Sequence, residues 1–208
     1  MELFTFLLAT FTSLLSIANP FAAMPFFLAM TDGDSNEHRR QQALKACIYT
    51  VLILGIFLFG GNYIISFFGI SLEGIRIAGG LLIMKMAYSL LDPDSQGRKL
   101  TAADHSEAYR KPDISFSPLA MPMLAGPGSI ALTLGFASQS SSVTDYLVIS
   151  IAILLVAVTS FVLLVVARRM TKMLGRTGMT ALTRMMGFIA LTIGVQFIIN
   201  GVRPIIGT

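Results

Sequence analysis

Charged residues are scarce in this chain: only 12% of its 208 residues are Asp, Glu, Lys or Arg, whereas 54% are hydrophobic and the mean hydropathy is +0.75. This composition is typical of a chain with several membrane spans and argues against a water-soluble domain. At 22.4 kDa, the chain has no room for a soluble catalytic or nucleotide-binding domain beside such spans.

The chain also lacks the residues of common catalytic and metal sites. Cys47 is the single cysteine, which excludes an internal disulfide. The interiors of the apolar stretches hold no Asp, Glu or His, and there is no Walker motif, Gly-x-Ser-x-Gly motif or metal-ligand spacing. We therefore expect no enzyme, no metal and no cofactor. Because proton-coupled transporters usually need a titratable relay in the membrane, the sequence favours exchange or sodium coupling for a transporter.

Six apolar stretches are long enough to cross a bilayer, since about 20 residues span its hydrocarbon core. They cover residues 3–30, 46–68, 71–91, 116–138, 145–167 and 183–206. The sequence thus predicts an all-α, polytopic membrane protein with one transmembrane domain over residues 1–208. Residues 3–30 follow no basic segment, so we interpret them as a retained span and not as a cleaved signal peptide.

Two of these stretches are interrupted by helix-breaking residues. Asn19-Pro20 lies within the first stretch, and Gly126-Pro127-Gly128 lies within the fourth. Proline removes a backbone donor and clashes with the preceding turn, so a helix that contains it mid-span must kink or open. Opened backbone survives in a membrane only where it is buried in protein or lines a cavity. The breaks therefore predict a site within the membrane.

The two halves of the chain resemble each other weakly and in the same order. Ala18-Asn19-Pro20 corresponds to Ala125-Gly126-Pro127, and Arg76-x-x-Gly79 corresponds to Arg184-x-x-Gly187. Each half has three predicted spans, an odd number, so the second half must enter the membrane from the opposite side. We expect two inverted three-helix repeats, at about 1–91 and 115–208, joined by a cytoplasmic linker at 92–114.

Positive charge is concentrated in alternate loops. These loops contain Arg39, Arg40, Lys45, Arg98, Lys99, Arg110, Lys111, Arg168, Arg169, Lys172, Arg176 and Arg184, whereas the opposite side has only Arg76 and Arg203. Cytoplasmic loops of membrane proteins are enriched in Lys and Arg, which predicts that both termini lie on the periplasmic side. The net charge of +4 follows from the same bias, so we expect a lipid bilayer and no nucleic acid as partner. The oligomeric state is left open.

Several motifs resemble the MarC family of integral membrane proteins along nearly the whole chain. They include Pro118-Leu119-Ala120-Met121-Pro122, the segment 125–130, the segment 184–187 and the segment 194–201. The family name records an association with multiple antibiotic resistance. The resemblance also implies transport, since some members are described as transporters of small neutral amino acids, and it fits a bacterial inner membrane.

The break residues are the candidates for substrate binding. They are Asn19, Pro20, Gly126, Pro127, Gly128 and Ser129. A half-helix that starts at each break presents free backbone N–H groups and the positive end of the helix dipole, which suit a carboxylate. The alternative is that both breaks are proline kinks needed only for packing.

Five further polar residues lie within or beside the spans. They are Arg76, Lys85, Arg184, Gln196 and Asn200. Lys85 is either functional or extends to the headgroups. Arg76 and Arg184 are either interfacial anchors or gates that pair with acids such as Glu73. Gln196 and Asn200 either face a cavity or bond between helices.

The sequence therefore favours a secondary transporter of small amino acids or similar small metabolites. The first alternative is efflux of drugs or other amphipathic compounds, for which a wide cavity lined by Phe and Met would be expected. The second is a non-transporting assembly or sensory subunit, in which the breaks bind nothing.

Overall fold

The computed structural model describes residues 2–92, 113–140 and 142–207, and this part of the chain contains helices and no strand. The predicted linker at 92–114 falls outside the described residues, except at its ends. The helices are α1 (Glu2–Ala18), α2 (Pro20–Met30), α3 (Asn36–Phe68), α4 (Leu72–Leu91), the wide and irregular η1 (Ser115–Leu124), α7 (Pro127–Gln139) and α8 (Val143–Ile206). The expected all-α class is confirmed.

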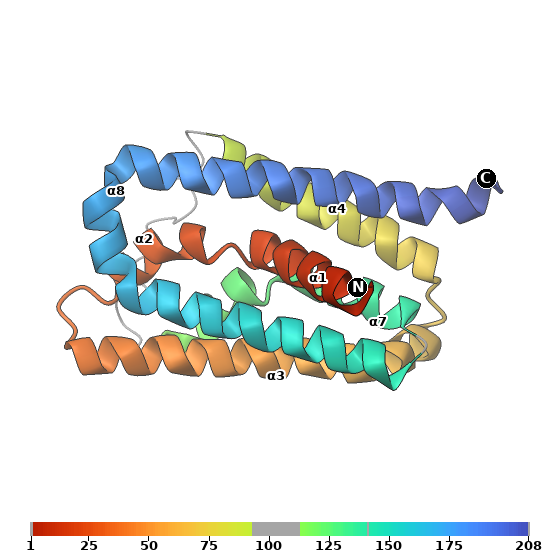
Figure 1. The fold of residues 1–208 in the computed structure, drawn as a ribbon, viewed down its shortest axis with the longest axis horizontal. Coiled ribbons are helices and arrows are strands. Elements are labelled where there is room, and N and C mark those ends of the chain that lie inside the picture. Colours follow the sequence, from red (N-terminus) through yellow and green to blue (C-terminus); the bar gives the residue numbers. More distant parts are fainter. Residues whose placement is uncertain (1, 93–112, 141, 208) are drawn as a thin grey trace.

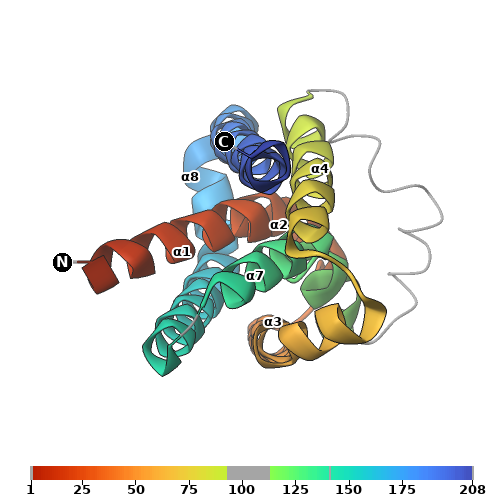
Figure 2. The ribbon, with the colours of Figure 1, turned by 90° about the vertical axis from the view of Figure 1, so that its right-hand side faces the viewer.

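The helices form three layers (Figures 1 and 2). One outer layer holds α4 and the second part of α8, and the other holds α3 and the first part of α8. The broken helices, α1–α2 and η1–α7, lie between them. In Figure 1, α1–α2 runs right to left and η1–α7 runs left to right. The two helices of each outer layer also run in opposite directions.

Five helical segments are long and apolar enough to cross a membrane, and the bent pair η1–α7 makes a sixth if it is counted as one span. Leu3–Met30 is one of the five segments, so the first break lies inside a single span and does not divide it in two. η1 and α7 meet at an angle of 60°. The structure thus supports five or six spans. Both predicted interruptions are present, because one helix ends and another begins at each of them.

The connection between the last two predicted spans differs from the expectation. We expected residues 168–182 to form a basic loop between spans at 145–167 and 183–206, but α8 continues through it and is interrupted only at Gly175. Ten of its fifteen residues are Arg, Lys, Met, Leu or Ala, all of which form helices readily, so the polarity of the segment did not end the helix. Gly175 adopts φ +63°, a conformation that favours glycine, and the chain turns there.

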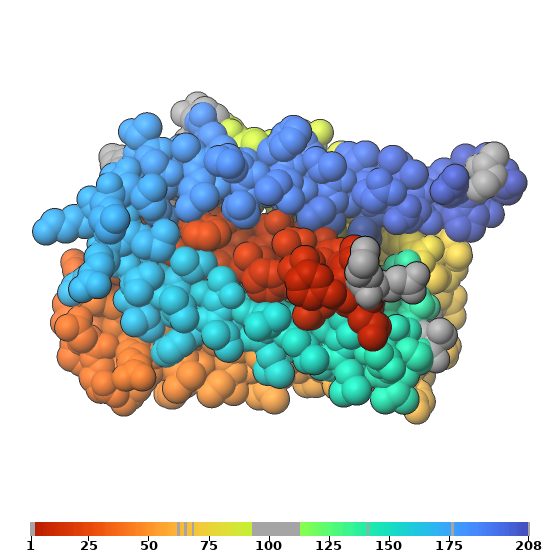
Figure 3. Space-filling view, in the orientation of Figure 1, coloured from red at the N-terminus to blue at the C-terminus, as the bar shows by residue number. Residues whose placement is uncertain are grey.

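The outer faces of the helices are strongly apolar. Tyr63, Phe67 and Phe188 are each more than 60% exposed, and they belong to a much larger set of exposed hydrophobic side chains. Figure 3 shows that α1 also reaches the surface, between the two parts of α8. Apolar exposure on this scale is what a lipid environment requires.

Glycines allow α4 and the second part of α8 to pack backbone to backbone. A Cβ atom added at Gly80 would lie 2.6 Å from the Gly194 carbonyl oxygen, and one added at Gly194 would lie 2.9 Å from the Gly80 carbonyl oxygen. Gly187 and Gly201, each seven residues or about two turns from Gly194, also meet α4, and a Cβ atom added at either would lie 2.8 Å from an α4 side chain. Small residues of this kind bring membrane helices into close contact.

A charged pair anchors the start of η1 to α3. The Lys45 ammonium lies 2.8 Å from an Asp113 carboxylate oxygen, and the other Asp113 oxygen accepts from the Ser115 backbone N–H at 3.0 Å. The hydrogen bond from Lys45, followed by those from Ser115, lowers the pKa of Asp113 to about 2. Beside this pair, the Gln42 side-chain oxygen accepts from the Ile114 backbone N–H.

We expect Gly80→Ala to lower the Tm of the detergent-solubilised protein by about 3–10 °C, because overpacking typically costs about 1–3 kcal/mol. The matched control is Gly55→Ala on α3, where an added Cβ would meet nothing within 4 Å. The control should leave the Tm unchanged or raise it slightly, since alanine favours helix. Equal Tm values for the two variants would contradict the close α4–α8 contact.

We expect Asp113→Asn to lower the Tm by about 1–3 °C at pH 7, a small effect because the pair is partly exposed to solvent. Asparagine retains an oxygen that accepts from Ser115, so the variant removes mainly the charge. A lowered carboxyl pKa stabilises the fold above the unfolded pKa, and this contribution is lost as pH falls through the folded value. The difference in Tm should therefore shrink between about pH 4 and pH 2. A difference that does not change with pH would contradict the ion pair.

Candidate functional site

Asn19 separates α1 from α2 in a left-handed backbone conformation, with φ +39° and ψ +65°. Asparagine tolerates this conformation better than most residues, which explains why the chain can open here. The Asn19 backbone N–H donates to the Leu15 carbonyl at 2.9 Å and so closes α1. Its side-chain oxygen accepts from the Ala22 N–H at 3.2 Å and caps α2, whose first residue is Pro20. The bond to the third helical residue and the proline at the first position are usual at a helix N-terminus, whereas the left-handed backbone of the cap residue is not.

The Asn19 side chain is 4% exposed, and its Nδ2 group has no hydrogen-bond partner in the described part of the protein. A buried donor without a partner costs about 1–3 kcal/mol. The side chain therefore holds an unused donor at the N-terminus of α2, where the helix dipole already favours an anion.

The second break is formed by Ala125 and Gly126, between η1 and α7. Gly126 is the N-cap of α7, and no side chain caps this terminus. A Cβ atom at Gly126 would lie 2.3 Å from the Pro122 carbonyl oxygen, so only glycine fits. The Ser129 hydroxyl is fully buried and donates to the Leu124 carbonyl at 3.0 Å, which bonds the two sides of the break to each other. Pro127 is exposed.

The two breaks lie against each other. A Cβ atom at Gly128 would be 3.0 Å from Ile17, in the last turn of α1, and 3.1 Å from the Met86 sulfur on α4. α2 and α7 begin at these breaks and run toward opposite ends of the molecule (Figure 1), so their N-termini face the same region. Ile17 precedes Asn19 by two residues and Gly128 follows Gly126 by two, so this contact brings the two breaks together in the middle layer, with Pro20 and Ser129 next to them in the sequence.

Sequence reasoning missed the apolar neighbours of the breaks. Ile17, Ile83 and Met86 pack on Gly128, and no motif distinguishes them from other residues of the spans.

Sequence reasoning also missed the role of Arg39, which it assigns to a polar loop. Arg39 is 5% exposed and donates to the Thr31 hydroxyl at 2.9 Å and to the Thr31 carbonyl at 2.6 Å. It therefore stabilises the C-terminus of α2, where a cation is favoured.

The other candidates lie away from the breaks. Lys85 is exposed on α4. Arg76 donates to the Asn200 carbonyl at 3.4 Å and forms no ion pair with Glu73 in the described structure. The Nε atoms of Arg76 and Arg184 are both buried without a partner in this part of the chain.

The side chains of Gln196 and Asn200 match neither expectation, which was that they face a cavity or bond between helices. The Gln196 side chain donates to the Asn200 side-chain oxygen at 2.9 Å within α8, and both side chains are exposed. They neither face the breaks nor bond between helices, because the two lie one turn apart on the outer face of α8. The Asn200 backbone carbonyl, by contrast, does reach another helix, since it accepts from Arg76 of α4.

A family model described as "MarC family integral membrane protein" matches residues 4–206. The chain is 38% identical to the UPF0056 membrane protein MJ1677 of Methanocaldococcus jannaschii, over 98% of both chains. It is 34% identical to the UPF0056 membrane protein YvbG of Bacillus subtilis, over 97% of this chain and 96% of that one. It is 36% identical to the UPF0056 inner membrane protein MarC of Escherichia coli, over 94% and 93%. No solved structure matches. The chain therefore belongs to the MarC family of integral membrane proteins.

Proposed function

We propose that this protein is a secondary transporter of small amino acids or similar small zwitterions across the inner membrane, with its substrate site at the two breaks. One observation carries the proposal: the Asn19 side chain is buried at the N-terminus of α2 with its Nδ2 donor unused, beside the uncapped N-terminus of α7. Unused donors and two positive dipole ends suit a carboxylate. Discontinuous helices that face an anionic substrate group in this way are frequent in transporters.

The directions of the helices support an inverted repeat. α1–α2 runs opposite to η1–α7, α3 runs opposite to the first part of α8, and α4 runs opposite to its second part (Figure 1). Each span of the first half thus has an oppositely directed counterpart in the second half, as inverted topology requires. Transport would then proceed by movement of one half against the other around the breaks.

The distribution of charge supports the orientation. α3 begins and the first part of α8 ends at one end of the molecule, and these segments contain Arg39, Arg40 and Arg168; the described chain ends lie toward the other end (Figure 1). By the positive-inside rule, the basic end is cytoplasmic and both termini are periplasmic. The name of the Escherichia coli relative, an inner membrane protein, agrees with this location.

The tight packing at the breaks favours a small substrate over a large amphipathic one. Ile17, Met86 and Ile83 all lie within 3.4 Å of an added Cβ at Gly128. Because Asn19 and Ser129 are also buried, the structure represents a closed conformation, and the site must open to one side for substrate to enter.

We expect Asn19→Gly to reduce uptake into proteoliposomes by about ten- to a hundredfold, because a hydrogen bond to a charged group contributes about 1.5–3 kcal/mol. Glycine accepts the left-handed backbone and weakens an N-cap by only a few tenths of a kcal/mol, so the fold should survive. Uptake is measured with a labelled amino acid below saturation.

The matched control is Asn36→Gly, at the exposed start of α3. It makes the same substitution at a helix N-terminus away from the breaks and should transport like the unmodified protein. Both variants should elute as the same monodisperse species in detergent. Full uptake by folded Asn19→Gly protein would show that Asn19 does not bind the substrate.

We expect saturable uptake of at least one member of a panel of glycine, alanine, serine and threonine, tested under sodium, proton and counter-substrate gradients. The lack of intramembrane Asp, Glu or His predicts that a proton gradient alone drives it least. If the protein takes up no amino acid of the panel but transports bulky amphipathic cations, drug efflux would be favoured. No transport of either class would favour a non-transporting subunit.

A further inference from the structure

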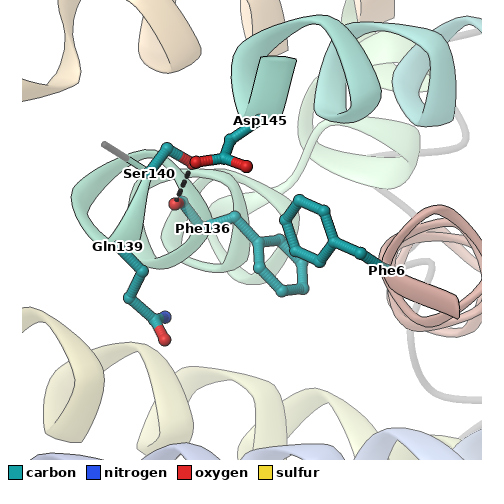
Figure 4. Close-up of a pocket in the computed structure, with 5 residues that line it drawn as sticks. All are labelled: Phe6, Phe136, Gln139, Ser140 and Asp145. Atoms are coloured by element: carbon teal, nitrogen blue, oxygen red, sulfur yellow. Dashed lines mark hydrogen bonds between the residues drawn. The ribbon is translucent and has the colours of Figure 1, made fainter. Parts of the chain in front are cut away.

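A pocket of about 250 Å³ opens at the end of the molecule opposite the basic loops. It is lined by Phe6 of α1 and by Phe136, Gln139, Ser140 and Asp145 (Figure 4). The Phe6 and Phe136 rings meet edge to face, with centroids 6.2 Å apart, and close one side of it. Its volume lies below the range of about 300–1,000 Å³ that is usual for drug-sized ligands.

The same pair of helices connects this pocket to the breaks. α1 and α7 meet at Phe6–Phe136 at the pocket and at Ile17–Gly128 at the breaks. Eleven residues separate Phe6 from Ile17, which corresponds to about 16 Å along a helix, or half the hydrocarbon thickness. The seam between α1 and α7 therefore leads from one membrane face to the middle.

Thr10 lies on α1 four residues after Phe6 and seven before Ile17, spacings that place it on the same face of the helix as these two residues of the seam. Its side chain is fully buried, and its hydroxyl has no partner among the described residues. Among the described residues, the buried hydroxyls of Ser160 and Thr171 on α8 share this state, whereas a helical hydroxyl can donate to the carbonyl four residues earlier. Thr12 and Ser16 of the same helix do so, at 2.7 and 2.8 Å. Across the seam, the fully buried Thr133 donates to the Ser129 carbonyl at the break.

We propose that the α1–α7 seam is the substrate path from the periplasmic face, with the pocket as its mouth, the Phe6–Phe136 pair as its gate and Thr10 as a contact for the substrate halfway along. The inference rests on the proposed function for its substrate, a small zwitterion. Polar groups at the mouth, at Thr10 and at Asn19 give such a substrate successive hydrogen-bond partners. The mouth also holds the C-terminus of α7 and Asp145, which favour the ammonium end.

Single-cysteine labelling tests the path without any transport. Cys47, the only native cysteine, is first replaced by alanine, and Thr10→Cys is introduced. We expect the cationic, membrane-impermeant reagent trimethylammonioethyl methanethiosulfonate, applied to the periplasmic face of the protein in membranes, to modify this cysteine at least ten times faster than a Thr50→Cys control. Thr50 is equally buried (1% exposed), but it lies on α3 and donates to the Ala46 carbonyl.

The gate is tested in the same background. Phe6→Ala should raise the labelling rate of the cysteine at position 10 at least a further threefold, because it removes one ring of the pair. Phe59→Ala is the matched control, since it removes one ring of the stacked Phe59–Tyr146 pair, which lies outside the seam. It should leave the rate unchanged.

Equal labelling of the cysteines at positions 10 and 50 would overturn the path, whether or not Asn19→Gly abolishes uptake. Equal effects of the two phenylalanine variants would overturn the gate. Rapid labelling at position 10 in a protein that transports neither amino acids nor amphipathic compounds would support the path and overturn the proposed function instead.

Discussion

The structure depends on one constraint: within hydrocarbon, every backbone N–H and C=O group must find its partner inside the protein. The unbroken helices satisfy this constraint through their own backbone hydrogen bonds, so they can form the outer layers with apolar side chains toward lipid. The two broken helices cannot, because Asn19 and Gly126 leave helix ends in mid-membrane. Only the middle layer, covered on both sides, can hold them. The three-layer arrangement thus follows from the positions of two short breaks.

The breaks are held by contacts from several helices. Asn19 caps α2 from within, and Arg39 stabilises the other end of α2 from α3. Ser129 joins the two sides of the second break, and the Lys45–Asp113 pair holds the start of η1. The unused donor of Asn19 and the unpartnered hydroxyl of Thr10 contrast with these bonded groups, and in the described chain they share this state with Ser160, Thr171 and the Nε atoms of Arg76 and Arg184. A buried polar group that a fold leaves unsatisfied requires an explanation, and at Asn19 and Thr10 the proposed binding of a substrate supplies one.

For the proposed function, the contacts between the helices constrain how the buried breaks could open. α1 meets α7 through both an aromatic pair and a glycine contact, whereas α4 and α8 are joined backbone to backbone over several turns. Separation of α4 from α8 would break contacts along the whole interface, but separation of α1 from α7 would break far fewer. Opening at the α1–α7 seam is therefore the less costly movement. It would also expose the breaks from the end at which the pocket already lies.

The sequence by itself determined the membrane environment, the helical class, the family and the position of both breaks, because apolar run length, Asn-Pro and Gly-Pro-Gly are local properties that act wherever the segment lies. It did not determine that residues 168–182 are helical, because polar residues that form helices readily resemble a loop in composition. Only the tertiary structure decided that Gly128 meets Ile17 and Met86, that Arg39 is buried, and that Gln196 and Asn200 face outward. These outcomes depend on which face of each helix meets a neighbour, and in spans that are apolar all round the sequence contains no periodic signal that marks that face.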